Sequence, residues 1–237
     1  ASPEGRAEGV VNLDALTYAG NRENLASLQG DARHVFMHGD ITDRALVDRL
    51  LAEHRPRAIV HFAAESHVDR SIHGPDAFLD TNILGTHSLL KAARSVWTAQ
   101  GGFAGKRFHH VSTDEVYGTL GPQDPAFTET TPYAPNSPYA ASKIGADQLA
   151  LSYHRSFELP VAILRPFNTY GPRMRVKDGR AVPAFMSQAL RNEDVTVFGD
   201  GSQTRSFTYI TDLVDGIIKL MLSKENDPVN IGNPREM

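Results

Sequence analysis

The feature that most constrains this chain is the alternation of short apolar runs with longer segments of helical pattern. We expect the apolar runs to be strands at residues 10–14, 34–37, 58–64, 107–111 and 161–164. Strands that alternate with helices indicate βαβ units and a parallel sheet. Because the crossovers in such units are right-handed, the pattern predicts a doubly wound α/β fold.

Helix-start signals place the helices between these strands. A short helix is expected at 21–28, and Thr42 is expected to cap an amphipathic helix. Pro75 suits the first turn of a long helix that reaches Trp97, and Ser137 and Pro138 open a helix to about Phe157.

The regular alternation of strands and helices ends after residue 165. The loops lengthen there, and helices are expected at about 181–190 and 211–222. We therefore predict two domains, a larger one at 1–165 and a smaller second lobe at 166–237.

The composition argues against nucleic acid, a membrane or a metal ion as a partner. The 237 residues carry a net charge of −4, which gives no sign of nucleic acid or an anionic membrane as a partner. Cysteine is absent, and no His-x-x-x-His pair falls on a predicted helix, so we expect no metal site. No apolar run approaches the ~20 residues that cross a bilayer. We expect a cytoplasmic protein.

Asp14 follows the first predicted strand. In a dinucleotide fold an acid at this position accepts hydrogen bonds from the adenosine ribose, and with no nearby arginine it favours NAD over NADP. A simple turn aspartate is the alternative. That fold should begin with a strand and a Gly-x-x-Gly-x-x-Gly turn, but only Gly5 and Gly9 precede Asp14. Either the first strand and its turn lie outside this chain, or the chain binds no dinucleotide; the other motifs favour the former.

Residues 112–118 follow a predicted strand and bring a hydroxyl and two adjacent carboxyls to its end. In open α/β sheets, ligands bind beyond the carboxyl ends of the strands. Asp114 and Glu115 can divide acid and base work if their surroundings separate their pKa values, or they can be ordinary loop acids. Both can reach one substrate only if the chain turns at this point, because neighbours on an extended segment point apart.

Tyr139 and Lys143 stand four residues apart on one predicted helix and so share a face. Lowering a tyrosine pKa from about 10 towards 7 requires roughly 4 kcal/mol. A solvated ammonium at ~4 Å supplies only about 1 kcal/mol. The pair therefore indicates catalysis only where a cationic cofactor lies beside it.

Five motifs now stand in order, at residues 14–21, 39–41, 63–71, 112–118 and 139–143. Together they resemble the dTDP-glucose 4,6-dehydratases, a branch of the extended short-chain dehydrogenase/reductase family with a Rossmann-like fold. In the second lobe, residues 165–174, 178–180 and 201–205 more closely resemble the UDP-glucuronate decarboxylases. The mixture leaves the nucleotide base, dTDP or UDP, open.

The resemblance implies a set of functional residues. NAD would be bound by Asp14, Leu16, Thr17, Asp40, Ile41, Phe62, Ala63, Ala64, Thr81, Tyr139 and Lys143. A nucleotide-diphosphate sugar would be held by Ser66, Thr113, Asn168, Arg205 and Asn230. Catalysis would fall to Thr113, Asp114, Glu115, Tyr139 and Lys143. The family also implies a homodimer.

Three functions remain in competition. The first is a lyase that converts dTDP-glucose to dTDP-4-keto-6-deoxyglucose, and the second is a decarboxylase or epimerase on the same scaffold. The third is a non-catalytic fragment, because the phosphate-binding turn is absent. Asp114 favours the first, since eliminating water needs an acid at the leaving group and decarboxylation does not.

Overall fold

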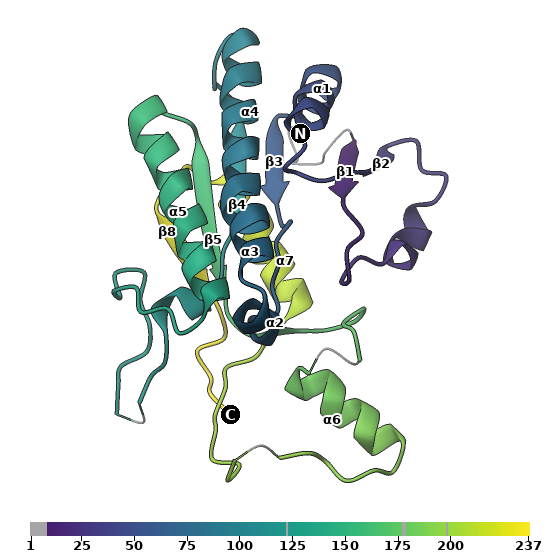
Figure 1. Cartoon of the computed structure of the whole chain (residues 1–237), viewed down its shortest axis with the longest axis vertical. Coiled ribbons are helices and arrows are strands. Elements are labelled where there is room, and N and C mark those ends of the chain that lie inside the picture. The colour runs from purple at the N-terminus through teal and green to yellow at the C-terminus, as the bar shows by residue number, and fades with distance from the viewer. Residues whose placement is uncertain (1–8, 122, 177–178, 198) are drawn as a thin grey trace.

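A parallel sheet at the centre of the molecule carries the candidate site (Figure 1). The computed structural model describes residues 9–121, 123–176, 179–197 and 199–237. Four strands pair in the order β3-β4-β5-β8: β3 (Ala58–His61), β4 (Arg107–Val111), β5 (Val161–Pro166) and β8 (Pro228–Ile231). The inner strands β4 and β5 are almost wholly buried, as expected of a parallel sheet covered on both faces.

A second parallel pair, β1 (Val10–Asp14) and β2 (His34–His38), lies beyond β3. In the dinucleotide-binding strand order 3-2-1-4-5-6, β2 and β1 correspond to the third and second strands. The strands β3, β4 and β5 correspond to the fourth, fifth and sixth. The described residues thus supply each of these positions except the first, which in that order lies between β1 and β3.

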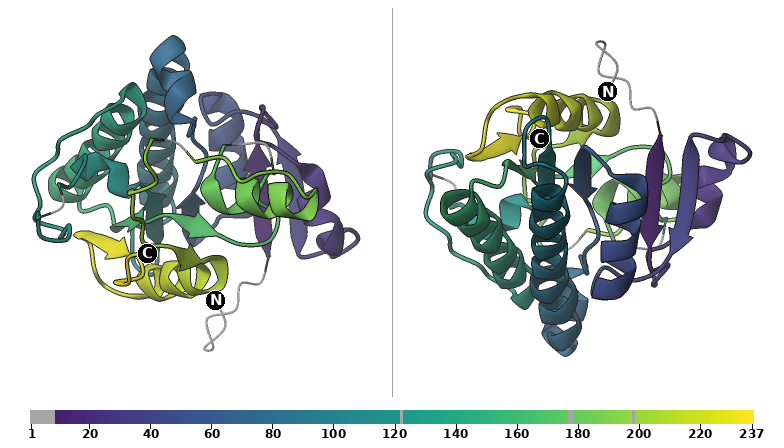
Figure 2. Two further views of the ribbon diagram at one scale, coloured as in Figure 1. Left: turned by 90° about the horizontal axis from the view of Figure 1, so that it is seen from below. Right: turned by 90° about the horizontal axis from the view of Figure 1, so that it is seen from above.

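Helices cover both faces of the sheet (Figure 2). On one face α1 (Arg44–His54), α4 (Thr86–Ala99) and α5 (Pro138–Phe157) pack around a core that contains Leu90, Trp97 and Phe108. On the other face α7 (Ile210–Leu222) packs Leu213, Ile217 and Leu220 against β5. The predicted doubly wound α/β fold is confirmed.

Helix α5 begins and ends where the sequence predicts. The side chain of Ser137 accepts a hydrogen bond from the amide of Ala140 at 3.1 Å, and Pro138 occupies the first turn. At the other end, Glu158 adopts the left-handed conformation with φ of 57° and stops the helix. These two ends fix where Tyr139 and Lys143 lie.

Three local expectations differ from the structure. The cap of α1 is Asp43, not Thr42, because the Asp43 carboxylate accepts from the amide of Leu46 at 3.0 Å. Strand β3 ends at His61, so residues 62–64 form the following loop. The long helix from Pro75 is α3 (Asp76–Phe78), a π-helical segment (Leu79–Gly85) and then α4. Such π segments are frequent at functional sites.

The C-terminal part of the chain divides between two places. Strands β6 (Thr169–Tyr170) and β7 (Thr208–Tyr209) pair apart from the main sheet, and α6 (Ala181–Leu190) lies away from it in Figure 1. The segments α7 and β8 instead pack on the main sheet. The division into domains at residue 165 stays a prediction. Among the described residues, no helix combines the length and apolarity that crossing a membrane requires.

Candidate active site

The chain turns directly after β4, where the sequence places its two carboxyls. Thr113 is extended, and its hydroxyl accepts a hydrogen bond from the amide of Glu115 at 3.3 Å. This bond starts a 3₁₀ turn, η3 (Asp114–Tyr117). In a helical turn, neighbouring side chains no longer point to opposite sides. The turn that a shared substrate requires is therefore present.

The two carboxyls of η3 differ in their surroundings. Asp114 is half-buried, and loss of hydration raises the pKa of its carboxyl to about 6. Hydrogen bonds from the Thr113 hydroxyl and the local backbone only partly oppose this rise. Glu115 is more exposed as a residue, yet loss of hydration at its carboxyl and the neighbouring Asp114 also raise its pKa. A carboxyl with a pKa near 6 is suited to donate a proton near neutral pH.

Tyr139 lies in the first turn of α5 and faces η3. Its phenol is buried, and Thr113 lies close enough for its hydroxyl to lower the pKa of the phenol slightly. Burial, with a smaller contribution from the negative charge of Glu115, raises the pKa of this phenol above its ordinary value. The described residues by themselves thus hold Tyr139 protonated, and a phenolate requires added positive charge.

Lys143 is buried one turn further along α5. Its ammonium donates a 2.7 Å hydrogen bond to the carbonyl of Val111, the last residue of β4. Burial lowers the pKa of the ammonium to about 8, although Asp147 opposes this effect. The lysine therefore ties α5 to the strand end from which η3 starts.

Residues after β5 complete the predicted set of substrate contacts. Arg205 lies close enough to Asp114 for its charge to lower the pKa of that carboxyl. The side chain of Asn168 donates to the carbonyl of Ser206 at 3.3 Å, and Asn230 accepts from the Tyr117 phenol at 2.8 Å.

Ser66 is exposed in the loop after β3 and adds a hydroxyl at the edge of the main sheet. Of the motif at 178–180 that the sequence singles out, Asp178 lies outside the described residues.

Apart from Tyr139 and Lys143 of α5, the predicted cofactor residues lie at or just after the carboxyl ends of β1, β2 and β3, or in the π-helical segment. The Asp14 carboxylate accepts from the amide of Leu16 at 2.7 Å, and Thr17 follows in the same loop. The Asp40 carboxylate accepts from the amide and hydroxyl of Thr42, both at 2.8 Å. The remaining ones are a buried Ile41, an exposed Phe62, and half-buried Ala63, Ala64 and Thr81.

Carboxylates and backbone groups at strand ends suit the ribose and base of a dinucleotide. The residue types present suit the two ends of such a cofactor: a carboxylate at Asp14 for a ribose, and the phenol and ammonium of Tyr139 and Lys143 for a reactive ring. A glycine-rich turn for the pyrophosphate is not among the described residues.

Two residues near the site received no role from the sequence. Asn82, in the π-helical segment, is buried and hydrogen-bonds both the amide and the carbonyl of Glu65 at 2.9 Å. Its amide also donates to the hydroxyl of Ser142 at 2.8 Å, which ties β3's loop to α5. Arg180, beside α6, lowers the pKa values of Glu115 and Tyr139. In the sequence, the only sign of the role of Asn82 is that an asparagine stands within an apolar helical pattern.

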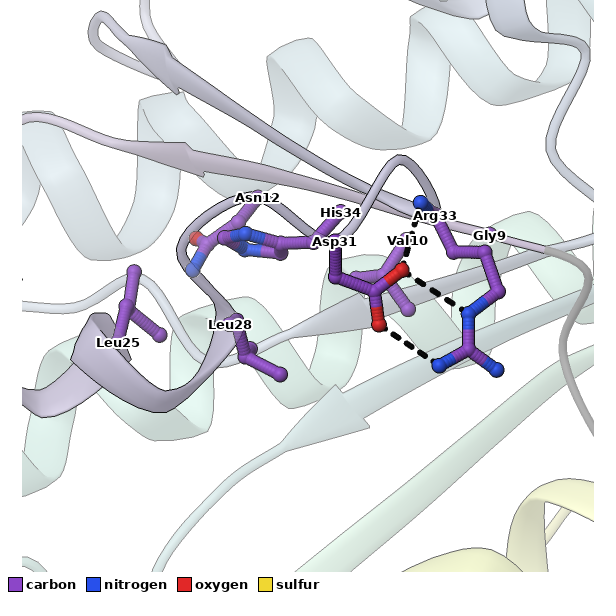
Figure 3. A pocket seen from close by; sticks show the side chains of 8 residues that line it. All are labelled: Gly9, Val10, Asn12, Leu25, Leu28, Asp31, Arg33 and His34. Carbon is purple, nitrogen blue, oxygen red and sulfur yellow. Dashed lines mark hydrogen bonds and ion pairs between the residues drawn. The ribbon is translucent and has the colours of Figure 1, made fainter.

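A separate hollow lies at the opposite ends of β1 and β2 (Figure 3). Val10 and His34, the first residues of these strands, line it, and an exposed ion pair between Asp31 and Arg33 borders it. Since ligands of such folds bind beyond the carboxyl ends of the strands, this hollow is not the candidate active site.

The fold and the site define a Rossmann-like α/β protein with a tyrosine–lysine pair beside two carboxyls. Residues 3–237 match the family described as GDP-mannose 4,6 dehydratase, and the chain belongs to this family.

Curated relatives narrow the resemblance. The dTDP-glucose 4,6-dehydratase of Xanthomonas campestris pv. campestris (strain B100) is 49% identical over 96% of this chain and 65% of its own length. The dTDP-glucose 4,6-dehydratase 1 of Escherichia coli (strain K12) is 43% identical over 97% of this chain and 66% of its own length. The chain thus spans just under two thirds of these relatives. The resemblance that the five motifs indicate is confirmed.

Solved structures agree. A double mutant of DesIV, a dTDP-glucose 4,6-dehydratase from Streptomyces venezuelae with NAD and DAU bound, superposes with a TM-score of 0.88 at 42% identity. That match covers 99% of this chain and 69% of the other. A UDP-glucose 4-epimerase from Thermotoga maritima with UDP-glucose reaches a TM-score of 0.86 at 31% identity, over 97% of this chain and 70% of the other.

Proposed function

We propose that this chain is the catalytic part of a dTDP-glucose 4,6-dehydratase, an NAD-dependent lyase. The observation that carries the proposal is the turn η3, which brings Asp114 and Glu115 to one strand end beside Thr113 and Tyr139. Two carboxyls are what the elimination of water across C5 and C6 of a hexose needs. The family membership and the relatives' printed names support the same reaction.

The residues divide the work as follows. Thr113 positions the sugar 4-hydroxyl, and Tyr139 takes its proton. Glu115 removes the proton at C5, which the 4-ketone has made acidic, and Asp114 protonates the departing 6-hydroxyl. The raised pKa of Asp114, about 6, suits this last step because a proton donor must be protonated at the working pH.

NAD is the proposed cofactor, since solved relatives carry it. When bound, it would accept hydride from C4 and return it to C6, and its oxidised ring would supply the positive charge that Tyr139 needs. This chain's residues would hold it by the carboxylate of Asp14 at the ribose, by the loops after β2 and β3, and by Lys143 at the reactive end.

The nucleotide sugar would lie against the second lobe. Arg205 is a natural diphosphate clamp, because a guanidinium offers paired donors to phosphate oxygens. Ser66, Asn168 and Asn230 would complete the contacts. Of the two bases left open by the sequence, we propose dTDP, on the strength of the relatives' names. We further propose a cytoplasmic homodimer, as the family resemblance implies.

The test is made on the full-length protein with NAD⁺. We expect dTDP-glucose to yield the 4-keto-6-deoxy sugar, and Glu115→Gln and Asp114→Asn both to block elimination. Only Glu115→Gln should also stop exchange of the C5 hydrogen with solvent deuterium, so each variant serves as the other's control. The proposal is wrong if the protein leaves dTDP-glucose untouched but epimerises UDP-glucose or releases carbon dioxide from UDP-glucuronate.

A further inference from the structure

A charged pair sits wholly inside the protein, behind the candidate active site. Arg165 of β5 and Asp147 of α5 are buried to 1% and 0% exposure. The Asp147 carboxylate accepts from two guanidinium nitrogens, at 3.2 and 3.1 Å, and its other oxygen lies 3.4 Å from His110. Such buried pairs contribute little net stability, because removing both charges from water offsets their attraction. The pair therefore calls for another role.

The guanidinium of Arg165 is held between two phenols. One nitrogen donates to the hydroxyl of Tyr117 at 2.7 Å, and another donates to the hydroxyl of Tyr133. The two rings lie 5.1 and 5.0 Å from the guanidinium carbon. Because a guanidinium is planar and its donors point in fixed directions, these contacts fix the places of both phenols.

The two phenols belong to different parts of the chain. Tyr117 is the last residue of η3, the turn that begins with Asp114 and Glu115. Its hydroxyl accepts a hydrogen bond from Arg165 and donates one to Asn230 in β8 at 2.8 Å. Both partners lie on strands of the main sheet, so they fix the position of the hydroxyl. Tyr133 lies in the following loop and has no place in η3.

Asp147, the partner of Arg165, lies on α5, the helix that also carries Tyr139 and Lys143. Asp147 follows Lys143 by four residues on α5 and shares its face. The Arg165–Asp147 pair thus connects the helix that carries Tyr139 and Lys143 with the turn that carries the two carboxyls.

We propose that Arg165 is a positioning residue for the elimination step, which it serves by holding the carboxyl-bearing turn η3 through the Tyr117 hydroxyl. This inference rests on the proposed dehydratase function and assigns the arginine no contact with substrate. Its physical basis is geometric: a displacement of about 1 Å of a catalytic group can cost on the order of 10²-fold in rate.

Tyr117→Phe tests the proposal, and Tyr133→Phe is its matched control. Each variant removes one phenol hydroxyl that accepts from Arg165, but only Tyr117 belongs to η3. Replacing Arg165 itself would leave Asp147 as an unpaired buried charge and endanger the fold. In the full-length protein with NAD⁺ and dTDP-glucose, the rise of bound NADH measures C4 oxidation, and its decay measures the later steps.

We expect Tyr117→Phe to slow the decay of bound NADH by about 10- to 100-fold while its rise changes by less than about threefold. Tyr133→Phe should leave the ratio of the decay rate to the rise rate within about twofold of the parent's. If this ratio is unchanged in Tyr117→Phe, or falls equally in both variants, the proposal is overturned. If the parent protein forms no NADH from dTDP-glucose, the proposed function fails instead, so the two failures are distinct.

Discussion

Lys143 donates a 2.7 Å hydrogen bond to the backbone carbonyl of Val111. This bond joins the first turns of α5 to the end of β4, so the lysine helps to place the strand end from which the carboxyl-bearing turn begins. An ammonium fixed in this way can act on a phenol through its charge while also supporting the backbone.

Removing the Tyr139 hydroxyl should abolish C4 oxidation and leave the fold intact. Tyr139→Phe loses the proton acceptor but keeps the buried ring. We expect no bound NADH on mixing with dTDP-glucose, together with a circular dichroism spectrum like the parent's. Rapid NADH formation by this variant would exclude the phenol as the base.

The Asp114→Asn variant should separate oxidation from elimination. The amide keeps the shape of the carboxyl but cannot donate a proton as an acid, and a positioned general acid contributes about 10²–10⁴-fold. We expect the variant to form the 4-keto sugar and to accumulate bound NADH, as measured by its absorbance. In the parent protein, the elimination rate should fall as the pH rises through about 6, because Asp114 loses its proton there.

The same variant should be more stable than the parent at pH 7. The pKa of Asp114 is raised to about 6, so between pH 4 and 6 the folded protein holds a proton that the unfolded chain has lost. Stability contributed by this group is therefore lost as the pH rises through that window. Discounting for its partial exposure, we expect Asp114→Asn to raise the free energy of unfolding at pH 7 by about 1–2 kcal/mol. Urea titrations at pH 4 and 7 measure this, and an equal difference at both would contradict it.

Lys143→Met should have a pH-dependent effect on stability. Burial lowers the pKa of Lys143 to about 8, so above that pH the unfolded chain binds a proton that the folded protein lacks. Stability of the parent relative to the variant should then rise with pH between about 8 and 10, by roughly 3 kcal/mol at most. Denaturant titrations across this range measure the difference. A constant difference would show that the ammonium is not desolvated. Any C4 oxidation by this variant should begin at a higher pH.

Asn82→Ala should destabilise the protein more than Ser142→Ala. The first change removes a buried side-chain amide that makes three hydrogen bonds, and unsatisfied buried groups cost about 1–3 kcal/mol each. We expect a loss of roughly 3 kcal/mol for Asn82→Ala. Ser142→Ala removes only one of the three bonds and should lose about 1 kcal/mol. Thermal unfolding of the two variants compares them, and equal losses would show that Asn82 does not join Glu65 to α5.

The sequence alone determined the local elements wherever propensity and burial agree. The run at 161–164 is apolar on both faces, which is typical of a strand in a buried parallel sheet, and it forms β5. Ser137 and Pro138 set the start of α5 because capping depends on a few adjacent residues. The motif order then sufficed for the family, since five short segments agreed in spacing.

Only the tertiary structure decided how distant residues meet. Asn82 and Ser142 are 60 positions apart, and Arg165 and Tyr117 are 48 apart, so no local pattern could have paired them. The protonation of Asp114 and Tyr139 was likewise beyond the sequence, because loss of hydration depends on what packs around each group. The residue types determine which reactions the side chains can perform, and their packing determines which side chains meet and which of them hold a proton.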